Sequence, residues 1–218
     1  LGGVVRSRLV ARDFKPRGEK EREDLFAATP PLELLKAQLS RAASKRGRKV
    51  LVIDVKKAHL YPKCEGEVFI ELPPEAGAGP GVCGQLVHWL YGFRPAAQAW
   101  ESHYSSNLEG IGFVRGRASP VSFYNSVTDV SCLVHGDDFT ALCTREQSDW
   151  LVDELKKHFE LKVSGRLGGD TDDDLAVRIL NRTVCWTEEG ILYELDSCHA
   201  DIVCKQLGLD GSKGCKAV

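Results

Sequence analysis

A short apolar run that ends in a carboxylate constrains this chain more than any other feature. Residues 50–53 read Val-Leu-Val-Ile, and Asp54 follows them directly. A strand that is apolar on both faces belongs in the interior of a sheet. We therefore expect a central strand here, with Asp54 held at the edge of that sheet on a rigid base.

A second group of carboxylates follows another apolar stretch. Residues 130–135 lead into Gly136, Asp137 and Asp138, and residues 139–143 are again mostly apolar. The pattern of strand, Gly-Asp turn and strand predicts a β-hairpin. Such a turn would lift Asp137 and Asp138 out of the core beside a neighbouring strand end.

Three carboxylates at one sheet edge predict a site for divalent metal. Hard oxygen ligands suit Mg²⁺, or Mn²⁺, bound together with substrate phosphates. Two such ions, about 3.5–4 Å apart, would stabilise the attacking and leaving oxygens of an in-line phosphoryl displacement. On spacing alone, the alternative is that Asp54 ends a strand and that Asp137 and Asp138 form an ordinary polar turn.

Several short motifs surround these carboxylates in a fixed order. Each is weak alone, but their order along the chain makes coincidence a poor explanation. They are RLVARDFK at 8–15, EDLFAATP at 23–30, DVKKAHL at 54–60, EVFIELPP at 67–74, LYGFRPAAQAW at 90–100 and HGDD at 135–138.

In this order the motifs resemble those of the copia-type retrotransposon reverse transcriptases, the RNA-directed DNA polymerases of a Gag-Pol polyprotein. The resemblance runs from about residue 5 to about residue 209. It implies that Asp54, Asp137 and Asp138 are catalytic and bind the metals, with the carbonyl of Val55 as a further ligand. The two ions would be Mg²⁺ or Mn²⁺.

The resemblance also implies where deoxynucleoside triphosphates bind. Arg8 and Arg12 would hold the triphosphate, because arginine binds phosphate in a bidentate manner and keeps its charge. Arg94 would lie in the same pocket. His59 stands where the family has a bulky aromatic residue that excludes the ribose 2′-hydroxyl.

An RNA or DNA template with its primer would contact Lys15, His135 and Gly136. The chain departs from the family here, since His135-Gly136 replaces Tyr-Val and Pro95 replaces a Gln. These departures favour one alternative, a catalytically decayed remnant that still binds nucleic acid. A metal-dependent phosphohydrolase that uses the same carboxylates is a second alternative.

Apolar spacing predicts three helices, and the third begins with a capping box of Thr144 and Gln147. The order of strand, helix, hairpin, helix and strand is typical of the split ferredoxin-like arrangement. We expect an α+β fold, a reverse-transcriptase palm with helices on one face of an antiparallel sheet and the other face open to a duplex. The helical stripes are Leu32, Leu35, Leu39 and Ala42; Trp100, Tyr104 and Leu108; and Leu151, Leu155 and Phe159.

The whole chain, 1–218, is expected to form a single catalytic core. The predicted fingers cover about 1–46 and 60–95, the palm about 47–59 and 96–195, and a truncated thumb begins at 196–218. A further hairpin is expected from Arg178 to Leu195. Because residue 1 is Leu and methionine is absent, we expect a segment of a longer polyprotein, whose other segments are partners.

The net charge of −2 conceals charge segregation. Seven Lys or Arg residues lie within 6–22 and five within 41–49, whereas four Asp residues lie within 170–174. We expect the basic segments to offer a face to phosphates. The acidic run is expected to be a surface loop.

Cysteine use and hydropathy indicate the compartment. The eight cysteines contain no CxxC pair, so we expect reduced thiols and no structural zinc. No apolar run reaches the 18 or so residues that a membrane span needs. We expect an intracellular protein, cytoplasmic, within virus-like particles, or nuclear, that has no membrane partner.

Overall fold

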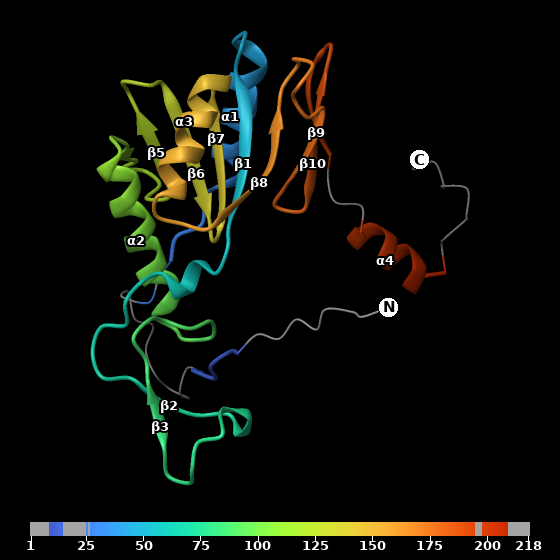
Figure 1. Cartoon of the computed structure of the whole chain (residues 1–218). Coiled ribbons are helices and arrows are strands. Elements are labelled where there is room, and N and C mark those ends of the chain that lie inside the picture. The colour runs from blue at the N-terminus through green and yellow to red at the C-terminus, as the bar shows by residue number, and fades with distance from the viewer. Residues whose placement is uncertain (1–8, 15–24, 26, 195–197, 209–218) are drawn as a thin grey trace.

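The computed structural model describes residues 9–14, 25, 27–194 and 198–208 of the chain. Figure 1 shows the elements in space. In chain order they are α1 (Leu32–Ser44), β1 (Lys49–Val55), the 3₁₀ turn η2 (Ala58–Leu60), β2 (Phe69–Glu71), the 3₁₀ turn η3 (Pro74–Ala76), β3 (Cys83–Gln85), α2 (Ala96–Gly110), β4 (Val114–Arg115), β5 (Ser122–Asn125), β6 (Val130–His135), β7 (Asp138–Cys143), α3 (Arg145–Lys156), β8 (Leu161–Leu167), β9 (Ala176–Ile179), β10 (Arg182–Thr187), β11 (Gly190–Glu194) and α4 (Cys198–Gln206).

A six-stranded antiparallel sheet forms the centre of the molecule, with the order β4-β5-β6-β7-β1-β8. The apolar run that begins at Val50 is an inner strand, as predicted. The inner part, β6-β7-β1-β8, has α2 after β1 and α3 after β7, which is the expected ferredoxin-like order. The α+β class and the antiparallel sheet are confirmed, and β4 and β5 extend the sheet beyond the prediction.

One face of the sheet is covered by α2 and α3, as expected. Leu51, Ile53 and Phe139 project from the strands into a core that Trp100 of α2 and Leu151 of α3 complete. The capping box at the start of α3 is present, which confirms its predicted beginning. Truncating a fully buried ring such as Phe139 would cost about 3–5 kcal/mol, so this core fixes the strand ends beneath the carboxylates.

The expectation that the opposite face is open is wrong. Leu35 and Leu39 of α1 and Val184 of β10 pack on that face, against Val50 and Leu142 of the central strands. In Figure 1, α3 lies in front of the sheet and α1 behind it. The physical reason is that the central strands are apolar on both faces, so an open second face would expose apolar side chains to water.

The predicted hairpin near the end of the chain is formed by β10 and β11, and β9 adds a third strand on the far side of β10. The β2–β3 hairpin lies at the lower end of the molecule in Figure 1, and α4 lies apart from the sheets. No helix in the described ranges is long and apolar enough to cross a membrane.

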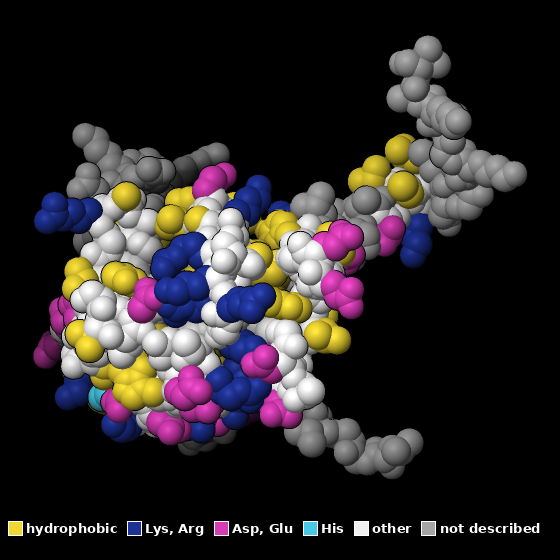
Figure 2. Space-filling view, turned by 90° about the horizontal axis from the view of Figure 1, so that it is seen from above, with side chains coloured by type: hydrophobic (Ala, Val, Ile, Leu, Met, Phe, Trp, Pro, Cys, Tyr) yellow, Lys and Arg dark blue, Asp and Glu magenta, His cyan; other side chains and the backbone are white. Residues whose placement is uncertain are grey.

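The basic segment at 41–49 is partly paired, but the side chains of Arg41 and Lys45 remain more than half exposed, and its role as a binding face for phosphates stays a prediction. Arg41, Lys45 and Arg48 all form ion pairs with one residue, Asp129, which has a left-handed backbone conformation. Figure 2, a view onto this end of the molecule, shows Lys and Arg side chains next to Asp and Glu. The basic residues of 1–8 and 15–22 lie outside the described residues.

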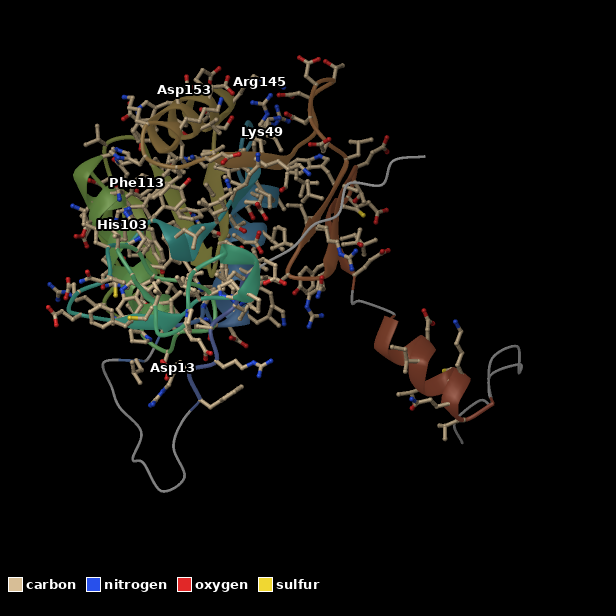
Figure 3. The ribbon with its side chains drawn as sticks, turned by 60° about the horizontal axis from the view of Figure 1, so that its bottom comes forward. Asp13, Lys49, His103, Phe113, Arg145 and Asp153 are labelled. Carbon is tan, nitrogen blue, oxygen red and sulfur yellow. The ribbon has the colours of Figure 1, made fainter. Side chains whose placement is uncertain are left out.

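The acidic run at 170–174 is a largely exposed loop, as expected, but one of its side chains is buried. Asp173 has a fully buried side chain that pairs with Lys49, Arg145 and Arg166, while Lys49 also binds Asp170 at 2.6 Å. Lys49 and Arg145 lie near each other in Figure 3. This ion cluster ties the loop to the start of β1 and the start of α3.

Candidate active site

Two of the three predicted catalytic carboxylates are direct cross-strand partners. Asp54 on β1 is paired with Asp138 on β7. Directly opposed residues of antiparallel strands have Cβ atoms about 4.5–5.5 Å apart and point to the same face. Both alternate with residues that face α2 and α3, such as Ile53 and Phe139, so they point to the α1 face of the sheet, near the end of β1 that is distant from Lys49.

The third carboxylate, Asp137, lies in the turn between β6 and β7. Gly136 supplies the backbone conformation of this turn, with φ of +62°, which favours glycine. The indole N–H of Trp100 donates to the carbonyl of Gly136 at 2.8 Å. The N–H of Val55 donates to the carbonyl of Asp137 at 2.9 Å. The turn is therefore fixed both to α2 and to the end of β1.

Burial raises the pKa of Asp138 above its usual range, and the charges of Asp137 and Asp54 raise it further, while His135 partly offsets them. The three carboxylates therefore share one crowded electrostatic environment. A cation bound between them would relieve this repulsion.

The donor set fits a hard divalent ion such as Mg²⁺, which uses one or two carboxylates and takes its remaining ligands from water and substrate phosphates. Asp54, Asp137 and Asp138 are the residues that would hold it. Within the described ranges, no group of three or more His, Cys, Asp or Glu side chains is arranged as a preformed metal site. The metal-binding roles of these residues and of the Val55 carbonyl remain predictions.

The strand register extends this site by one residue on each side. His135 of β6 is the cross-strand partner of Asp138, and Lys162 of β8 is the partner of Asp54. Lys162 is exposed, and the sequence analysis missed it. Nothing in its local sequence marks it, because only the pairing of β1 with β8 brings a positive charge beside Asp54.

The segment that carries Arg12, which is predicted to bind the triphosphate, is held against one loop, residues 90–94. The N–H of Ala11 donates to the carbonyl of Tyr91 at 2.8 Å. The N–H of Arg94 donates to a carboxylate oxygen of Asp13 at 3.0 Å. Arg12 lies between these two anchors with an exposed side chain, so the structure brings Arg12 and Arg94 together.

Of the remaining residues predicted to contact substrates, three lie in the part of the chain that the structure describes and two lie outside it. His59 lies in η2, directly after β1, and its ring stacks on that of Tyr91, with the ring centroids 4.6 Å apart. His135 and Gly136 lie beside the carboxylates. Arg8 and Lys15 lie outside the described residues.

A comparison with protein families matches residues 3–171 to the family described as reverse transcriptase (RNA-dependent DNA polymerase). The match covers most of the chain and includes the segment of Arg12, the loop at 90–94 and all three carboxylates. The chain therefore belongs to the reverse transcriptase family.

Proposed function

We propose that this chain is the RNA-directed DNA polymerase core of a copia-type retrotransposon, which adds deoxynucleotides to the 3′ end of a primer. The observation that carries the proposal is the cross-strand pairing of Asp54 with Asp138, with Asp137 in the turn beside them. Phosphoryl transfer depends mainly on positioning and on charge stabilisation, and a rigid row of carboxylates supplies both.

In this proposal Asp54 and Asp137 hold two Mg²⁺ or Mn²⁺ ions, with the Val55 carbonyl as a further ligand. Asp138, whose pKa is raised by its surroundings, is the supporting carboxylate. The ions, when bound, would neutralise charge on the attacking and leaving oxygens. Trp100 keeps the turn in place through its hydrogen bond to Gly136.

Substrates approach the row of carboxylates from different elements. Arg12 and Arg94, with Arg8, hold the triphosphate, and His59 limits the sugar to deoxyribose. His135, Gly136 and Lys15 contact the template and primer. Fingers at about 1–46 and 60–95, palm at about 47–59 and 96–195 and a thumb that begins at 196–218 complete the proposed division, within a polyprotein whose other segments act with this core inside the cell.

Primer extension tests this proposal. The full chain is incubated with a labelled DNA primer on an RNA template, the four deoxynucleotides and Mg²⁺, with a chelator control. Template-dependent extension that the chelator abolishes supports the proposal. Tight binding of the primer-template without extension would indicate the decayed remnant instead, and hydrolysis without a template would indicate a phosphohydrolase.

A further inference from the structure

The loop at 90–94 contacts both sides of the proposed nucleotide pocket through one residue, Tyr91. Its ring stacks on the His59 ring, with centroids 4.6 Å apart and an angle of 30° between the planes. Its backbone carbonyl accepts a hydrogen bond from the N–H of Ala11, the residue before Arg12, at 2.8 Å. The side chain and the backbone of one residue therefore meet two different parts of the pocket.

The backbone contact depends on a close approach that only glycine permits. Gly92 has φ of +93°, and a Cβ atom added there would lie 2.1 Å from the carbonyl oxygen of Ala11. Asp13 anchors the other side of Arg12 through the N–H of Arg94 at 3.0 Å. Figure 3 shows Asp13 at the opposite end of the molecule from Lys49, so this docking is independent of the ion cluster.

We infer that Tyr91 is a positioning residue that sets sugar selectivity through its ring and triphosphate affinity through its backbone. This inference rests on the proposed function, because it assigns to Tyr91 the orientation of His59. The 3₁₀ turn that carries His59 is only three residues long and follows Lys57, which is in a left-handed conformation. The ring of Tyr91, stacked on that of His59, restricts the orientations that the His59 ring can adopt.

Two kinds of variant separate the two roles. Tyr91→Leu removes the ring and keeps the carbonyl, and Tyr91→Phe is its matched control, because it keeps the ring. Asp13→Ala releases the Arg12 segment without changing Tyr91. Gly92→Ala releases the same segment by steric conflict, and a thermal unfolding curve for each variant reports whether it folds.

The assay is kcat/KM for single-nucleotide insertion opposite a template G, with dCTP and with CTP. We expect Tyr91→Leu to lower the dCTP to CTP ratio about two- to tenfold, the loss that one aromatic pair accounts for, and Tyr91→Phe to match the wild type. Asp13→Ala should raise KM for both nucleotides about tenfold and leave their ratio unchanged, because a charged hydrogen-bonding group is misplaced. An unchanged ratio in Tyr91→Leu, or an equal loss in Tyr91→Phe, overturns the inference.

Calorimetric titration of the full chain with dCTP and with CTP in Mg²⁺ distinguishes failure of this inference from failure of the polymerase assignment. If the wild type prefers dCTP in binding but does not extend primers, the polymerase proposal fails, and the inference is judged by binding alone. A smaller preference for dCTP in Tyr91→Leu than in the wild type then supports the inference, and an unchanged ratio of the two Kd values overturns it. If the wild type binds neither nucleotide, the inference is also overturned.

Discussion

Replacement of Asp173 by Asn tests how the ion cluster stabilises the fold. The carboxylate is fully buried and accepts hydrogen bonds from Lys49, from Arg145 at 3.0 Å and from the backbone N–H of Asp170 at 3.0 Å. In Asp173→Asn, Lys49 keeps, among the residues that the structure describes, only Asp170 as an acidic partner, although its own side chain is 3% exposed. Breaking a buried pair costs about 3–5 kcal/mol, and the remaining Asp170 contact places the expected loss near about 3 kcal/mol.

The pKa values give the sign of the pH dependence. Burial alone would raise the pKa of Asp173, but the hydrogen bonds from Lys49 and the backbone of Asp170 hold it below its ordinary value of 3.8. The carboxylate therefore contributes its full stabilisation above pH 3.8, and this contribution is lost as the pH falls through the lower folded value. The difference between wild type and Asp173→Asn should be full at pH 7 and shrink in acid.

Urea denaturation at pH 7 measures this loss, which corresponds to a decrease in melting temperature of about 6–12 °C. Asp172→Asn is the matched control, because the Asp172 side chain is 79% exposed and lies 3.7 Å from Arg145. An exposed pair of this kind contributes at most about 1 kcal/mol. If Asp173→Asn is no less stable than Asp172→Asn, the buried cluster does not stabilise the fold.

Three further predictions concern the site and its ligands. Asp138→Asn should remove a pH dependence of stability. The folded pKa of Asp138 lies above 3.8, so the wild type loses stability as the pH rises from 3.8 through that folded value, whereas the variant should not. Parallel curves of unfolding free energy against pH for the two proteins would contradict this. Trp100→Phe should lower the free energy of unfolding by about 1–2 kcal/mol in urea denaturation, because the Gly136 carbonyl loses its indole donor at 2.8 Å. A loss no larger than that of Tyr104→Phe would show that this hydrogen bond contributes nothing. Affinity for a primer-template should fall steeply between about 50 and 200 mM salt in fluorescence anisotropy, because phosphate contacts release counterions. A flat response would count against nucleic-acid binding by the basic segments at 6–22 and 41–49.

The sequence predicted the parts of this fold that depend on local patterns. The capping box of Thr144 and Gln147 marks the start of α3, and the apolar run before Asp54 identifies an inner strand, since both signals lie within a few residues. The two apolar segments also predicted that Asp54, Asp137 and Asp138 lie at one edge of the sheet, but the direct pairing of Asp54 with Asp138 depends on the register of β1 with β7.

The remaining features depend on contacts between distant parts of the chain. Lys49 and Asp173 are 124 positions apart, so the charges of each segment alone suggested solvent exposure for both. Lys162 is beside Asp54 only because β8 pairs with β1 in this register. Tyr91 contacts His59 through a loop whose sequence has no periodic pattern. The second face of the sheet is covered because α1 returns to it, and no local pattern in the sequence shows that return.

The central claim is that Asp54, Asp137 and Asp138 form a metal-dependent site for nucleotidyl transfer. The most direct test is primer extension by Asp54→Asn beside Asp153→Asn, an aspartate on α3 whose side chain is largely exposed and lies outside the site. We predict that Asp54→Asn slows extension about a thousandfold or more, because it removes several kcal/mol of transition-state stabilisation, while Asp153→Asn extends at the wild-type rate. Extension by Asp54→Asn at the rate of Asp153→Asn would contradict the account.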